Sequence, residues 1–167
     1  MKILNIHGYK GSPLNSACTA LNEIDHEIVS PSFDFDNTDP NEVLKSLELI
    51  VRYKGVKLII GSSLGGFFAA VLASRVKLPV ILINPCLMPF LHLPRLGYTG
   101  DILGYTALFS EIAKLDPGYV KVIVGAKDEV IDTHDFTLRL FPNATVMPEG
   151  MHSGATLDLK TYFSKLL

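Results

Sequence analysis

The amino-acid sequence predicts an α/β fold in three layers, with helices on both faces of a mostly parallel sheet of about six strands. Short apolar runs recur along the chain, and helical patterns alternate with them. The central runs are nearly continuous Val, Ile and Leu, without the apolar/polar alternation of a strand that has one face in water. Strands covered on both faces are typical of a parallel sheet between helices, joined by right-handed crossovers.

These short apolar runs are the predicted strands. They cover residues 2–6, 26–30, 56–60, 79–84, 120–124 and 144–148.

Helical patterns separate these runs. The clearest covers 39–55, where Asp39 suits the N-cap, Pro40 the first turn and Gly55 the C-terminal stop. The pattern at 64–76 is apolar on all sides, which is typical of a central helix that lies against the sheet. Further helices are expected at 14–24, 105–115, 132–141 and 156–166.

Length and charge narrow the class of protein. The length of 167 residues favours one domain over residues 1–167. The formal net charge of −2 gives no electrostatic reason to expect binding to nucleic acid or to an anionic membrane. No apolar stretch is long enough to span a bilayer, and the amino-terminal residues lack the features of a signal peptide. Cys18 and Cys86 form no CxxC motif and are expected to pack as small hydrophobes in a reducing cytoplasm.

The segment IIGSSLGGFFAA interrupts a buried run with two serines and three glycines. Within it, GSSLG matches G-x-S-x-G with Ser63 in the centre, after a predicted strand and before a predicted helix, as in a nucleophile elbow. The central residue of an elbow has a strained backbone on a tight turn, so Gly61 and Gly65 supply the space that side chains would fill. Ser62 is expected to point away from the site. The alternative is that these small residues only allow close packing of the strand and the helix.

A serine hydroxyl is a poor nucleophile at its free pKa, so it needs partners. Asp128 follows the fifth predicted strand in VGAKDEVID, and His152 follows the sixth in PEGMHSG. Both lie where the ligand-facing loops of a parallel sheet gather, and they come in the chain order of an α/β-hydrolase triad. Asp132 is the weaker candidate acid, because it precedes a helical pattern and suits its N-cap. Taken singly, Asp128 suits a turn or cap, and His152 an ordinary loop.

Two backbone N–H groups are needed to hold the oxyanion of an acyl-transfer intermediate. We predict Leu64, which follows the nucleophile, and Tyr9, in the loop after the first strand, with Gly8 as the next candidate. His7 is expected to anchor this loop rather than to take part in catalysis. No spacing of His, Cys, Asp and Glu suggests a metal site. The histidines with no expected partners are His26, His92 and His134.

Residues 84–105 break the strand–helix rhythm with three prolines and three glycines among many apolar residues. The part from 86 to 105 is predicted to form a short lid over Ser63, which would favour short acyl chains. Packing on the edge of the sheet is the alternative. The candidate residues of this lid and acyl pocket are Leu87, Met88, Phe90 and Leu91.

Five segments span nearly the whole chain: LNIHGYKGSPLNS, IIGSSLGGFFA, LINP, GAKDEVID and EGMHSG. Together they resemble the α/β-hydrolase superfamily and, more narrowly, the small bacterial YqiA-like esterases. The resemblance implies a cofactor-free esterase with little cap, with nucleophile, acid and base at Ser63, Asp128 and His152. We therefore expect a minimal α/β-hydrolase fold with the strand order 2-1-3-4-5-6.

The predicted function is hydrolysis of small carboxylic esters, short-chain ones above all, through an acyl-enzyme and without a cofactor or metal. Two alternatives stay open: a thioesterase that uses the same groups, and a non-catalytic binding module with this fold. The sequence does not fix the natural substrate or the oligomeric state.

Overall fold

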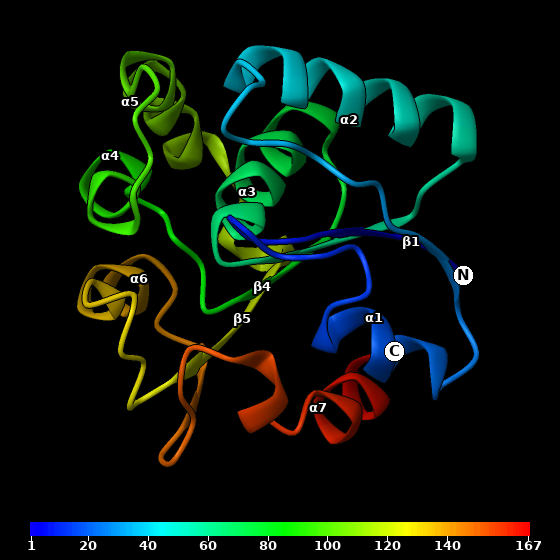
Figure 1. The fold of residues 1–167 in the computed structure, drawn as a ribbon. Helices are drawn as coiled ribbons and strands as arrows, with labels where there is room; N and C mark the ends of the chain where they lie inside the picture. Colours follow the sequence, from blue (N-terminus) through cyan, green and yellow to red (C-terminus); the bar gives the residue numbers. More distant parts are fainter.

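A computed structural model describes residues 1–167 as one six-stranded sheet between two layers of helices (Figure 1). Every strand pair is parallel, and the order across the sheet is β2-β1-β3-β4-β5-β6. The predicted fold class and strand order are therefore confirmed. The strands are β1 (Lys2–Ile6), β2 (Glu27–Val29), β3 (Leu58–Ser62), β4 (Val80–Ile83), β5 (Val120–Gly125) and β6 (Thr145–Met147).

The two layers of helices lie on opposite faces of the sheet (Figure 1). On one face lie α1 (Ser16–Asn22) and α7 (Leu159–Leu166). On the other lie α2 (Pro40–Lys54), α3 (Leu64–Val76) and α5 (Leu103–Phe109). The short helices α4 (Pro89–His92) and α6 (His134–Leu140) flank this second layer.

Successive residues of the central strands enter different cores. Ile59 and Leu82 pack with α2, α3 and α5, whereas Ile60 and Ile81 pack with α1 and α7. Because both faces of the sheet meet apolar helices, no polar alternation is left in the sequence of these strands. Helix α3 is buried along most of its length, as predicted for a helix against the centre of the sheet.

The helix ends follow their capping residues. In α2, Asp39 accepts a hydrogen bond from the backbone of Asn41, and Gly55 ends the helix in the left-handed region at φ 67°. Helix α1 begins later than predicted, at Ser16, because Asn15 caps it by accepting from the N–H of Cys18. The helix predicted at 105–115 is divided into α5 and a 3-10 segment at Ser110–Lys114.

Two further observations bear on the sequence predictions. Cys18 and Cys86 are both free and buried, so they pack as small hydrophobes. No helix combines the length and the apolar character that crossing a bilayer requires.

Candidate active site

Ser63 lies on the turn between the last residue of β3 and the first residue of α3. Its backbone has φ 54° and ψ −119°, a conformation that L-residues rarely adopt and that costs on the order of 1–3 kcal/mol. Hydrogen bonds on both sides hold it there. Its N–H donates to the carbonyl of Ile83 (3.0 Å), and its carbonyl accepts from Gly66 and Cys86 (both 2.9 Å). The turn is therefore fixed by β4 and by the segment that follows β4.

The glycines on either side of Ser63 stand where backbone segments meet. A Cβ at Gly61 would collide with the carbonyl of Gly65, and a Cβ at Gly65 would collide with the carbonyls of Ile6 and His7. These contacts involve backbone atoms, which a side chain cannot displace cheaply. Both positions thus require glycine so that β1, β3 and α3 can approach one another.

Asp128 follows β5 and is almost fully enclosed, with 1% of its side chain exposed. Its Oδ1 accepts the N–H groups of Val130 and Ile131, each at 2.9 Å. Its Oδ2 accepts from two histidines: Nε2 of His134 at 2.8 Å and Nδ1 of His152 at 3.0 Å. Burial alone would raise the pKa of Asp128, but these four hydrogen bonds outweigh burial and hold the pKa well below its usual value. The carboxylate is therefore charged and faces both imidazoles.

His152 lies in the loop after β6, and contacts from two other segments, those that follow β4 and β5, hold that loop. Asn84, at the end of β4, donates from Nδ2 to the carbonyls of Met151 (2.8 Å) and His152 (2.9 Å). The same side chain accepts the N–H of Gly125 at 2.8 Å, so one amide connects β4, β5 and this loop. Glu129 accepts the backbone N–H of His152 at 3.0 Å. The position of the imidazole is thus set by its backbone as well as by Asp128.

A cavity with a volume of about 240 Å³ brings Ser63 and His152 together. Asp128 and His134 are not part of its lining. Ser62, expected to point away, does contribute to the lining. No hydrogen bond joins Ser63 Oγ to His152, and bonds of this kind are often long until a substrate is bound. The other lining residues are Gly8, Tyr9, Gly11, Asn15, Ser16, Ile83, Ser153 and Gly154.

The loop after β1 approaches Ser63 closely. A Cβ added at Gly8 would lie 3.0 Å from Ser63 Cβ. The backbone N–H groups of Tyr9 and Leu64 donate to no acceptor in the protein. His7 holds the loop with both ring nitrogens: Nε2 accepts from Phe33 N–H (3.0 Å), and Nδ1 donates to the carbonyl of Gly8 (2.8 Å). This arrangement agrees with the anchoring role expected for His7.

The side chain of Tyr9, in the same loop, is held by a hydrogen bond as well. Its hydroxyl donates to Asp36 Oδ1 at 2.5 Å. Burial and this hydrogen bond raise the pKa of Tyr9 to about 12, so the phenol stays protonated and keeps its contact at neutral pH.

The structure does not bring the four predicted lid residues to the cavity that Ser63 and His152 share. Leu87 is 1% exposed and belongs to the main core, and Phe90 packs edge-on against Phe109 with ring centroids 5.3 Å apart. Met88 is half-buried and Leu91 is exposed. The segment therefore packs on the helical layer that contains α5.

Two sequence expectations are wrong. One is that Asp132 is the N-cap of the next helix, and the other is that His92 and His134 have no partners. Thr133, not Asp132, precedes α6 as its N-cap. Asp132 instead accepts from His92 Nε2 (2.9 Å) and from Arg95 (3.0 Å), which joins α4 to the loop before α6. His134 has a partner too, since it contacts Asp128. In the sequence, its only signal is a position six residues after the predicted acid, at the start of a helix.

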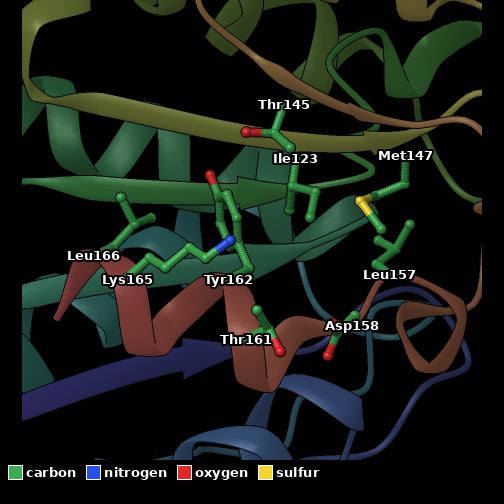
Figure 2. Close-up of a pocket in the computed structure, with 9 residues that line it drawn as sticks. All are labelled: Ile123, Thr145, Met147, Leu157, Asp158, Thr161, Tyr162, Lys165 and Leu166. Atoms are coloured by element: carbon green, nitrogen blue, oxygen red, sulfur yellow. The ribbon is translucent and has the colours of Figure 1, made fainter.

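A second cavity, of about 310 Å³, lies at the edge of the sheet between α7 and strands β5 and β6 (Figure 2). Ile123, Met147 and Leu157 line it together with α7 residues such as Tyr162, and none of the candidate site residues reaches it. Burial raises the pKa of Tyr162 to about 12. This cavity is thus separate from the one that contains Ser63.

The parallel sheet, the strained serine after β3 and the Asp–His pair after β5 and β6 define the class as the α/β-hydrolase superfamily. A family model described as an uncharacterised protein family, UPF0227, matches residues 2–155. The chain therefore belongs to UPF0227, the YqiA family.

Solved structures share the fold at low identity. A monoacylglycerol lipase from Paleococcus ferrophilus superposes with a TM-score of 0.72 at 16% identity, over 99% of this chain and 91% of that one. A hydrolase of the α/β superfamily from Xanthomonas campestris gives 0.69 at 19% identity, over 99% and 96%. A carboxylesterase of Nitrososphaera gargenis gives 0.63 at 12% identity, over 99% and 87%.

Proposed function

We propose that the protein is a serine hydrolase of carboxylic esters, with Ser63 as nucleophile, His152 as base and Asp128 as acid. One observation carries the proposal. A serine on a strained strand–helix turn shares a cavity with a histidine, and Nδ1 of this histidine is hydrogen-bonded to a buried carboxylate. Nucleophile, base and orienting group are the three parts that this chemistry needs. The esterases and lipases among the proteins of similar fold support the same class of reaction.

The tautomer of His152 follows from its hydrogen bond. Because Asp128 is charged and can only accept, Nδ1 of His152 carries the proton and Nε2 keeps a free electron pair. In the first step Nε2 removes the Ser63 proton while Oγ bonds to the ester carbonyl carbon. The C–O bond to the alcohol then breaks, and the alcohol leaves with the proton from His152. Water, deprotonated by His152 in its turn, then bonds to the acyl carbon, and Ser63 Oγ leaves and takes this proton back from His152, which releases the acid.

The oxyanion of each tetrahedral intermediate is proposed to be held by the N–H groups of Tyr9 and Leu64, which are free of other acceptors. Loss of one such donor typically costs about 10²–10³ in rate. His7 supports this role indirectly, because it fixes the loop in which Tyr9 lies.

His152 rather than His134 is the proposed base, although both contact the same carboxylate oxygen. His152 lines the cavity with Ser63, whereas His134 does not. The second ring nitrogen of His134 is buried without a partner, so it has no path to a substrate.

The cavity supports a preference for small acyl groups. Its volume of about 240 Å³ lies below the ~300–1,000 Å³ of typical small-molecule pockets. Ile83 is its only aliphatic side chain, which offers little surface to a long alkyl chain. We also place the activity in the reducing cytoplasm, which the unpaired state of both cysteines supports.

A substrate panel tests the proposal. Purified protein and the Ser63→Ala variant are assayed on p-nitrophenyl acetate, butyrate and dodecanoate and on a matched butyryl thioester. We expect hydrolysis of the two short esters by the parent protein, less of the dodecanoate, and none above background by the variant. A higher kcat/KM for the thioester would favour the thioesterase alternative. Folded protein that cleaves none of the four would favour a binding module.

A further inference from the structure

Two imidazoles share one oxygen of Asp128, and the proposed triad uses only one of them. We propose that His134 is a positioning residue, which holds the Asp128 carboxylate in the orientation that keeps Oδ2 bonded to His152. This inference rests on the proposed function, because it assigns to His134 a role in the same reaction. It stands on the 2.8 Å contact between His134 Nε2 and Asp128 Oδ2.

The Asp128 carboxylate accepts a hydrogen bond at each of its acceptor sites. An ionised carboxylate has about four lone-pair sites. In Asp128 the N–H groups of Val130 and Ile131 occupy two on Oδ1, and the two histidines occupy two on Oδ2. Without His134, one acceptor site of a buried charge would have no donor. The carboxylate could then rotate away from His152, or a water molecule could take the place of the missing donor.

A histidine at position 134 leaves one buried polar atom unsatisfied. Because Nε2 of His134 makes the contact with Asp128, Nδ1 is the ring nitrogen that needs another partner. That nitrogen is buried and has no partner. Buried polar atoms are nearly always satisfied, so this exception calls for an explanation. The contact between Nε2 and Asp128 is the explanation that we infer for this unsatisfied atom.

His134 is not placed to act as a second base, because it does not line the cavity with Ser63. The side chain of His134 is 11% exposed, against 22% for His152, and only His152 reaches the cavity with Ser63. His134 lies at the first position of α6, so a helix fixes its backbone. It acts on the reaction through Asp128 alone.

The experiment compares His134→Gln with His134→Met. Both replacements have a similar length, but only glutamine carries an N–H donor that reaches the place of Nε2. His92→Met is the matched control, because it removes a similar histidine–carboxylate bond (His92 Nε2 to Asp132 Oδ1, 2.9 Å) outside the site. Two readouts are used: the downfield proton NMR resonance of the His152 Nδ1–H, and kcat and KM on p-nitrophenyl butyrate.

We expect the downfield resonance in the parent protein, in His134→Gln and in His92→Met, and its loss or broadening in His134→Met. We expect kcat to fall about 10–100-fold in His134→Met with KM nearly unchanged, the size of effect seen when a residue that orients a metal-binding side chain is replaced. His134→Gln should recover most of that loss. If His134→Met does not fold, His134→Asn replaces it, because its amide is too short to reach Oδ2.

An unchanged resonance and kcat in the methionine variant would overturn the inference, and so would an equal loss in the glutamine variant. If the parent protein cleaves no ester but the resonance still depends on a donor at 134, the proposed function falls. The positioning of His152 through Asp128 by His134 would then stand.

Discussion

Replacement of Asp128 by Asn removes a charge without changing the shape of the side chain. One end of the new amide is an NH₂ group, which cannot accept the N–H donors that face it. If the NH₂ replaces Oδ2, both His134 and His152 must move their ring protons to the other nitrogen in order to accept from it. His152 would then carry its proton on Nε2 and be unable to take the proton of Ser63.

The contacts of Asp128 determine how much the replacement lowers the free energy of unfolding and kcat. The four hydrogen bonds to Asp128 change from charge-assisted to neutral, a loss of about 1 kcal/mol each, while Nδ1 of His134 is without a partner both before and after the replacement. We expect the free energy of unfolding to fall by about 3–5 kcal/mol. The wrong tautomer of the base is expected to lower kcat by about 10³–10⁴-fold.

The assay is kcat on p-nitrophenyl butyrate at a temperature where circular dichroism shows the variant folded, combined with urea unfolding. Asp132→Asn is the control, because Asp132 is exposed and its pair with His92 and Arg95 lies outside the site. This control should keep kcat and lose little stability. A kcat within tenfold of the parent value in Asp128→Asn, or an equal loss in Asp132→Asn, would refute the reasoning.

Two further predictions concern the same region. Asn84→Asp loses both donors to the carbonyls of Met151 and His152 and places a carboxylate oxygen against them, so we expect about 2–4 kcal/mol of destabilisation. Faster amide hydrogen exchange in residues 149–154 should accompany it, and unchanged exchange there would contradict the assignment. Because the pKa of Asp128 is lower folded than the unfolded ~3.9, its contribution is present above about pH 4 and is lost as pH falls further. Urea unfolding between pH 5 and pH 2 should therefore show a smaller acid-induced loss in Asp128→Asn than in the parent protein, and equal losses would contradict it.

The fold was predictable because its signals are local. Each strand is an apolar run bounded by polar or small residues, and α2 carries its own cap at Asp39 and its own stop at Gly55. The elbow is also local, since Gly61, Ser63 and Gly65 lie within five residues of one another.

The contacts of the site that were missed are not local in this sense. Asn84 meets the carbonyl of His152 across 68 residues, so no pattern in either segment reveals the bond. His134 lies only six residues from Asp128, but the path of the loop between them decides whether they meet. The apolar residues at 86–105 raise a different difficulty. Their composition is the same whether they cover a site or pack on a helix, and Leu87 and Phe90 do the latter.

The central claim is that Ser63 is an activated nucleophile, and covalent labelling measures this most directly. The parent protein is incubated with a fluorophosphonate, and intact-protein mass spectrometry with peptide mapping locates the adduct. We expect one adduct, on Ser63, none in Ser63→Ala, and much slower labelling in His152→Gln, because the elbow serine depends on its base. An adduct on Ser62, or no adduct on any serine of the folded protein, would contradict the account.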